Sequence, residues 1–159
     1  MSAAAATSAG RLLAFEVAGG LFALPIAEVA EVAEVGELAA VPMLPRSVGG
    51  VVNHHGDALF VVDGALLLER AAESARPAHL LVLARDPDDP DRFGLPVDRI
   101  HGLVDGPPAT ARGPGLVAAR RPLGERLLHI LDARRLFERA VTTIERSMAL
   151  SHPKQGGES

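Results

Sequence analysis

The chain has 159 residues, a formal net charge of -4 and no cysteine, so it can bury a sizeable core but cannot form a disulfide, a thiolate metal site or a cysteine nucleophile. Tryptophan and tyrosine are absent, which leaves little aromatic surface for stacking against bases or sugars. Acidic side chains outnumber basic ones in residues 1–69, and the remainder of the chain is only mildly basic. Because phosphate binding needs a concentrated basic face, we expect no nucleic-acid partner.

The two ends of the chain read as irregular. Residues 1–10 are rich in alanine and serine but lack the basic start and the apolar stretch of a signal peptide. We predict a disordered arm over residues 1–10, one domain over 11–150 and a disordered polar tail over 151–159. No run approaches the roughly 18 apolar residues of a membrane span, so we expect a soluble, cytoplasmic protein without direct membrane insertion.

Most of the chain consists of short apolar runs separated by glycine, proline or aspartate, a pattern typical of strands in a small barrel or sandwich. Glycines at 19 and 20 predict a hairpin between the first two strands, and Asn53-His54-His55-Gly56 predicts a turn between the next two. In chain order the predicted strands cover residues 12–17, 21–25, 48–53, 58–63, 79–84, 92–96, 116–119 and 126–131.

Two connecting segments show apolar residues at every third position, within 26–32 and within 97–103. This spacing, directly after a proline, predicts one or two helical turns in each connector. Glutamates at 28, 31, 34 and 37 share the spacing, so the first connector is expected to carry an acidic face that is either solvated or in contact with a partner.

A longer helix is predicted at the C-terminus, over about residues 132–149. Asp132 suits the N-cap position, and His152-Pro153 is expected to end the helix. Its apolar stripe should pack on the second half of the chain or, less simply, fill a groove of a partner. The stripe consists of Leu136, Phe137, Ala140, Val141, Ile144 and Met148.

Two sequence blocks occur twice in the same order. Residues 22–26 (Phe-Ala-Leu-Pro-Ile) resemble residues 93–97 (Phe-Gly-Leu-Pro-Val), and residues 59–63 (Leu-Phe-Val-Val-Asp) resemble residues 128–132 (Leu-His-Ile-Leu-Asp). A repeated apolar pattern must bury its face in a repeated way, so we predict two similar subdomains, about 12–70 and about 78–138. The seam between them is the first place to look for binding.

No catalytic motif is present: the chain has no phosphate-binding loop, no Gly-x-Ser-x-Gly elbow and no His-Glu-x-x-His pair. We therefore predict a protein that is not an enzyme and has no cofactor or metal. The alternative of another class is a metal-dependent enzyme using His54, His55 and Asp57. Adjacent residues of an extended chain point to opposite faces, so the two histidines could chelate one ion only if the turn bends unusually.

The order of these blocks resembles the CheW-like adaptor domain of bacterial chemotaxis systems, from about Leu12 to Phe137. Each block alone is weak, but the set in this order at compatible spacing is specific. The blocks are residues 22–26, 29–32, Val41-Pro42 with Pro45, 48–56, 61–63, 94–100 and 130–136.

The resemblance implies a mainly β fold of two similar five-stranded, SH3-like β-barrels packed side by side around a continuous core, with short helical connectors and a C-terminal helix. It also implies a non-enzymatic adaptor, recruited to receptor arrays, that couples the cytoplasmic tip of a chemoreceptor to the regulatory domain of a CheA-type histidine kinase. For the glycines and the asparagine among these residues, the alternative to partner contact is a structural role, such as allowing an unusual backbone conformation or stabilising a turn. The expected partner contacts are Val29, Glu31, Asn53, His55, Gly56 and Gly94.

The chain departs from the family pattern at two arginines. The family usually has Asn-Leu-Arg-Gly where this chain has residues 53–56, and Asp-Leu-Arg where it has residues 63–65. The first arginine of the pattern can pair with the acid matching Glu31, so a Glu31–His55 contact is expected here, weakening as the imidazole loses its proton. The losses leave open an adaptor that binds the kinase but has lost receptor coupling.

Overall fold

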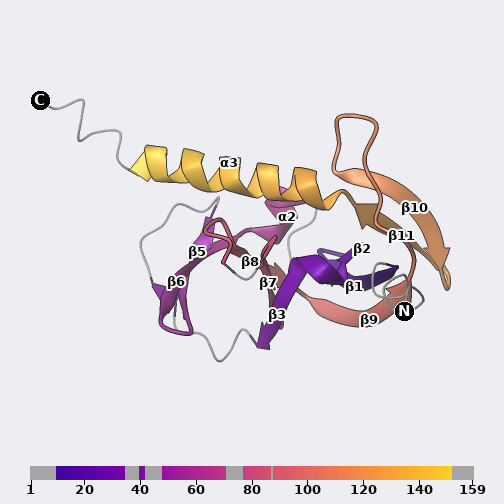
Figure 1. The fold of residues 1–159 in the computed structure, drawn as a ribbon, viewed down its shortest axis with the longest axis horizontal. Coiled ribbons are helices and arrows are strands. Elements are labelled where there is room, and N and C mark those ends of the chain that lie inside the picture. Colours follow the sequence, from indigo (N-terminus) through magenta and orange to yellow (C-terminus); the bar gives the residue numbers. More distant parts are fainter. Residues whose placement is uncertain (1–9, 35–39, 42–47, 71–76, 87, 152–159) are drawn as a thin grey trace, which may run out of the picture.

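The computed structural model describes residues 10–34, 40–41, 48–70, 77–86 and 88–151 (Figure 1). The predicted N-terminal arm, the polar tail and His152-Pro153 fall almost entirely outside these residues. In chain order the elements are β1 (Arg11–Val17), β2 (Gly20–Pro25), the 3-10 helix η1 (Ile26–Glu28), β3 (Val29–Glu34), β4 (Ala40–Val41), β5 (Val48–His54), β6 (Asp57–Val62), α2 (Gly64–Leu67), β7 (His79–Leu83), β8 (Phe93–Val97), β9 (Arg99–Asp105), β10 (Val117–Leu123), β11 (Arg126–Leu131) and α3 (Ala133–Ser151).

The strands form two sheets that lie side by side, as Figure 1 shows. Sheet A has the order β10-β11-β2-β1-β9, and sheet B has the order β3-β7-β8-β6-β5, with the two-residue β4 added at its edge. Side chains connect the two ends of each sheet. Arg121 on β10 donates to the carbonyl of Asp105 on β9, and His54 on β5 contacts Glu31 on β3. The predicted mainly β fold of two similar units is confirmed.

The two sheets do not coincide with the two halves of the sequence. Sheet A combines β1 and β2 with β9, β10 and β11, whereas sheet B combines β7 and β8 with β3, β5 and β6. The repeated blocks meet across the halves: β2 pairs in parallel with β11, and β8 pairs in parallel with β6. Each sheet thus contains strands from both halves of the sequence. The subdomain bounds predicted from the repeat, 12–70 and 78–138, would separate strands that pair within one sheet.

β-Bulges recur at matching places in the two sheets. In sheet B, β3 has one extra residue between Val29 and Glu31 opposite β7; in sheet A, β9 has one between Ile100 and Gly102 opposite β1. A second pair of bulges lies in β5 opposite β6 and in β10 opposite β11. Since bulges re-aim side chains and increase the local twist, their repetition gives both sheets the same curvature.

Alternating side chains of the strands supply three cores. One face of sheet A buries Leu12, Ala14 and Leu128 within its own curve, and one face of sheet B buries Leu59, Leu80 and Val82 in the same way. The opposite faces form one shared core between the sheets, as expected from the period of two. The shared core includes Phe15, Leu24, Leu81, Phe93 and Leu95 from the strands, and Leu136, Phe137 and Ala140 from α3.

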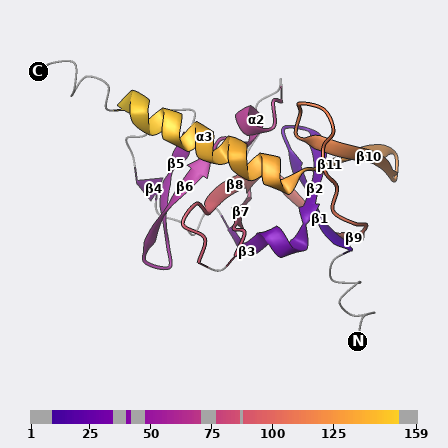
Figure 2. The same ribbon diagram turned by 45° about the horizontal axis from the view of Figure 1, so that its top comes forward.

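Two aspartates that match in the repeat begin the two helices. The Asp63 side chain accepts a hydrogen bond from the backbone N–H of Leu66 at the start of α2, and that of Asp132 accepts one from Arg135 at the start of α3. The predicted N-cap at Asp132 is confirmed. In Figure 2, α3 crosses the molecule with α2 beside it. The long helix thereby covers the shared core from one side.

The connectors after the two prolines differ from the prediction. A single 3-10 turn, Ile26–Glu28, follows Pro25, and the chain then enters β3. No helix follows Pro96, because β8 continues to Val97 and β9 begins at Arg99. The helical connector predicted within 97–103 is therefore wrong, and the one within 26–32 is reduced to one turn.

Candidate functional site

The turn between β5 and β6 is the first part of the candidate site. His55 and Gly56 both adopt positive φ angles, 53° and 87°, which is the signature of a type I′ hairpin turn. The Asn53 side chain accepts a hydrogen bond from the backbone N–H of Gly56 at 3.0 Å and holds the turn closed. The unusual bend at His55 turns its ring back toward the ring of His54, with centroids 4.1 Å apart.

Both histidines of the turn contact the same oxygen atom. His54 Nε2 lies 3.0 Å and His55 Nε2 lies 2.9 Å from Oε1 of Glu31 on β3. Since a carboxylate only accepts, each imidazole carries a proton on Nε2 in this arrangement. The predicted Glu31–His55 contact is confirmed, and His54 is an additional partner of Glu31. We call these three residues the Glu31 cluster.

The bulge in β3 aims Glu31 at the turn. Val29 lies opposite Leu83, whose side chain belongs to the shared core, whereas Glu31 lies opposite Val82, whose side chain faces the interior of sheet B. Directly opposed residues in antiparallel strands share a face. In a regular strand without the bulge, Ala30 would lie opposite Val82 and Glu31 opposite Leu81, so Glu31 would face the shared core as Val29 does.

The cluster ranges from buried to solvated. His54 is 8% exposed as a residue, while the side chains of Glu31 and His55 are 37% and 71% exposed. The hydrogen bond from His55 lowers the pKa of Glu31 below its ordinary value; partial burial opposes this change, and the hydrogen bond from His54 adds to it. Glu31 is therefore held as a carboxylate where the edge strand β3 meets the turn between β5 and β6.

The other residues named from the sequence lie apart from this cluster. Val29 is half-buried against the shared core, and Gly94 is buried in β8, where an added Cβ would come within 2.9 Å of Leu80. Asp57 pairs with Arg92 at 3.3 Å instead of joining the histidines. Among the described residues, the group able to hold a metal is Glu31, His54 and His55, so the predicted set with Asp57 is not the one that the structure assembles.

Exposed apolar residues were not selected from the sequence. Val32 is 45% exposed beside Glu31 on β3, and Leu103, at the matching place on β9, is 49% exposed. In the sequence, Val32 and Leu103 belong to the apolar residues at every third position that predicted helical connectors within 26–32 and 97–103. Val32 lies opposite Leu81 and so points to the other face of β3 from Glu31. We call the edge strand residues Glu31 and Val32, together with Asn53, His55 and Gly56 of the adjoining turn, the turn surface.

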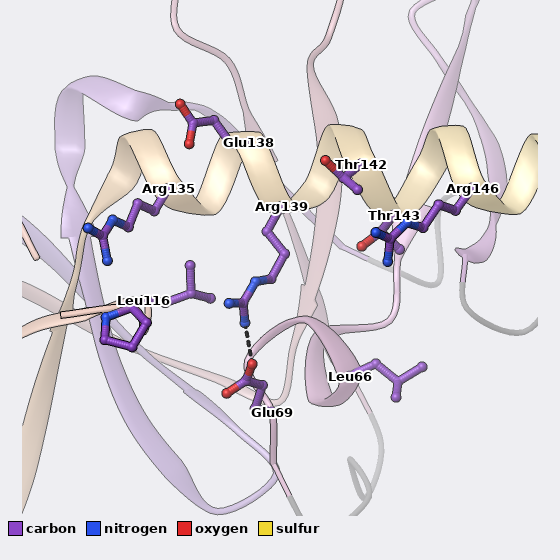
Figure 3. Close-up of a pocket in the computed structure, with 10 residues that line it drawn as sticks. Leu66, Glu69, Leu116, Arg135, Glu138, Arg139, Thr142, Thr143 and Arg146 are labelled. Atoms are coloured by element: carbon purple, nitrogen blue, oxygen red, sulfur yellow. Dashed lines mark hydrogen bonds and ion pairs between the residues drawn. The ribbon is translucent and has the colours of Figure 1, made fainter.

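A second surface feature is an open groove between α3 and the segment that follows α2 (Figure 3). Arg139 of α3 reaches across it to Glu69 at 2.6 Å. Arg135, Arg146 and two threonines of α3 also line it. Because this lining is mostly charged or polar and open to solvent, the groove differs from the enclosed apolar pocket that usually holds a small ligand.

Comparisons with known proteins agree on one family. The CheW-like domain model matches residues 11–141. The crystal structure of the scaffolding protein TtCheW from Thermoanaerobacter tengcongensis superimposes with a TM-score of 0.60 at 17% sequence identity, covering 77% of this chain and 83% of that chain. No curated protein matches the sequence significantly. Within the described residues, no helix is both long enough and apolar enough to cross a membrane.

Proposed function

Because the chain belongs to the CheW-like domain family, we propose that it is a non-enzymatic adaptor that couples the cytoplasmic tip of a chemoreceptor to the regulatory domain of a CheA-type histidine kinase. The observation that carries the proposal is the family match over residues 11–141. Such an adaptor works where the receptor arrays assemble.

The two-sheet architecture suits this role. An adaptor needs two recognition surfaces held at a fixed separation, and the shared core joins the two sheets rigidly through Phe15, Phe93 and Phe137. Sheets A and B present different side chains at matching positions, so one small domain can hold two unlike partners. The exposed edge strands β3 and β9 offer backbone and apolar groups for such contacts.

The turn surface is the proposed contact for one of the two partners. Val32 supplies exposed apolar area on one face of the edge strand β3, and Glu31 with His55 supplies charge and hydrogen-bonding groups on the other face. Asn53 and Gly56 contribute by fixing the turn. Val29 and Gly94 are less suited to direct contact, since one packs on the shared core and the other is buried in β8.

A pair of binding titrations tests the proposal. The protein is titrated with the regulatory domain of each CheA-type kinase of the source organism, and separately with the cytoplasmic tip of a receptor. We expect Val32→Asp to weaken one of these complexes by about tenfold or more, because a charge replaces an apolar contact. Leu103→Asp, at the matching place in sheet A, is the control and should leave that complex unchanged.

The outcomes separate the possible adaptors. No binding to any CheA-type kinase would contradict the adaptor proposal itself. Binding to the kinase without binding to any receptor tip would favour the variant adaptor that has lost receptor coupling, which the missing arginines at residues 55 and 65 suggest. Equal affinities for Val32→Asp and the wild type toward both partners would exclude the turn surface.

A further inference from the structure

The Glu31 cluster has the donor set of a transition-metal site. Three possible ligand atoms, one from each of Glu31, His54 and His55, lie within 4.8 Å of one another. They come from separate elements, β3 and the β5–β6 hairpin, which the fold brings together. We propose that this cluster binds one divalent transition-metal cation such as Zn²⁺, a function beyond the adaptor role and independent of it.

The two contacts with Glu31 fit such an ion with small adjustments, and all three ligand atoms lie within 4.8 Å of one another. Zinc binds imidazole nitrogen and carboxylate oxygen at about 2.0–2.2 Å, which places neighbouring tetrahedral ligand atoms about 3.3 Å apart. The two Nε2 atoms lie 3.0 and 2.9 Å from Glu31 Oε1, so opening each contact by a few tenths of an ångström makes room for the cation. Water fills the fourth position, because His55 and Glu31 face solvent.

The tautomer of the neutral His54 ring is free to suit a bound cation. Its side chain is 10% exposed, and its buried Nδ1 has no hydrogen-bond partner among the described residues. No bond at Nδ1 therefore fixes the tautomer. Nε2 can present either a proton to Glu31 or a lone pair to a cation. The ring is already held in position by burial, so little side-chain entropy is lost when a metal binds.

The donor types select among metals. Two imidazole nitrogens and one carboxylate suit Zn²⁺, Ni²⁺ or Cu²⁺, whereas Mg²⁺ and Ca²⁺ prefer sites made of oxygen atoms. A bound ion would join the edge strand β3 to the turn between β5 and β6. It would replace two hydrogen bonds with three coordinate bonds and close sheet B more firmly.

The test is a Zn²⁺ titration of the untagged full chain, stripped beforehand with a chelator and followed by calorimetry and by thermal unfolding. We expect one ion per chain and a rise in the unfolding temperature that Mg²⁺ does not reproduce. His55→Asn keeps the positive φ angle, which asparagine tolerates, but removes one ligand. It should weaken Zn²⁺ binding at least about tenfold, as should Glu31→Gln.

His101→Asn is the matched control, since His101 also contacts a glutamate, Glu16, at 3.1 Å but belongs to a cluster completed by an arginine. This variant should bind Zn²⁺ as the wild type does. The proposal is overturned by a wild type that does not saturate with one Zn²⁺, or by His55→Asn and wild type binding it equally. Because no kinase or receptor takes part, the result is separate from that of the partner titrations.

Discussion

The same bulge in sheets A and B carries opposite chemistry. In β3 the residue after the bulge is Glu31, which bonds to two histidines; in β9 it is Gly102, which has no side chain and a φ of 113°. An added Cβ at Gly102 would meet nothing within 4 Å. The two sheets therefore share the backbone bulge but differ in the side chain that follows it. Glu31 gives sheet B a charged group at this place, whereas Gly102 gives sheet A none.

In each sheet, nevertheless, a glutamate oxygen contacts two nitrogen-bearing side chains, which are histidine or arginine. In sheet A, Glu16 accepts from Arg126 at 2.9 Å and contacts His101 at 3.1 Å, which we call the Glu16 cluster. The Glu31 cluster has two histidines instead. Arginine keeps its charge at all ordinary pH values, whereas imidazole does not. Sheet A is thus held by a permanent cation, whereas sheet B is held by two imidazoles that also belong to the proposed metal site.

The helix caps give the largest expected difference between matching positions. Asp132 is 5% exposed and also accepts from the backbone N–H of Ala111 at 2.8 Å, whereas its counterpart Asp63 makes no such second bond to the residues that the structure describes. We expect Asp132→Ala to lower the free energy of unfolding by about 3 kcal/mol, because it removes a cap and leaves a buried donor unpaired. Asp63→Ala should cost about 1 kcal/mol. Urea denaturation measures both, and equal losses would contradict the comparison.

Placing a glutamate in sheet A at the position that matches Glu31 should destabilise the protein, because the backbone there has a positive φ angle. Gly102→Glu places a side chain on a residue with φ 113°, which we expect to cost about 1–2 kcal/mol in the free energy of unfolding. Gly102→Ala should cost nearly the same, since the space around the new Cβ is open. Thermal or urea unfolding of the two variants checks this; a neutral Gly102→Ala would show that the backbone relaxes freely.

The smallest expected effect concerns acid stability. The hydrogen bond from Arg126 is the main cause that lowers the pKa of Glu16 from its ordinary value of 4.5, so the folded state favours the carboxylate. This stability is present above that value and is lost as the pH falls through the lowered pKa. Glu16→Gln should lose less than about 1 kcal/mol at neutral pH, because the pair is partly exposed.

Unfolding curves between about pH 3 and pH 7 test this linkage. The difference between wild type and Glu16→Gln should shrink as the solution becomes more acidic. Glu125→Gln, in the exposed turn between β10 and β11 next to Arg126, is the control and should show no such convergence. A difference that stays constant across the range would mean that the carboxylate charge of Glu16 does not contribute.

Eight strands were predicted from the sequence, whereas β3, β9 and the two-residue β4 were not, and in β3 and β9 a bulge disguised the strand pattern. Val29 and Val32 lie opposite Leu83 and Leu81, so both are on the side of the shared core although three positions separate them. The extra residue in the bulge turns a strand period of two into a spacing of three. That spacing predicted helical turns in β3 and β9, and only tertiary pairing reveals the difference.

The candidate site was predictable in part for a related reason. The Glu31–His55 contact followed from the family pattern, because one residue replaces another at a fixed place. The participation of His54 did not follow, since alternation in an extended chain separates neighbouring side chains. The positive φ of His55 cancels that alternation, and an angle of this kind becomes visible only once the hairpin register is known.

The exchange of strands between the two copies constrains how the chain can reach its native state. Parallel pairing of β2 with β11 joins residues more than a hundred positions apart, as in Leu21 with Leu128. Neither copy synthesised alone contains all the strands of either sheet. Contacts between distant residues must therefore form, at a cost in chain entropy, before either sheet is complete. We expect slow, all-or-none folding for this reason. Two fragments cut between α2 and β7 should fold only together, because neither contains a whole sheet.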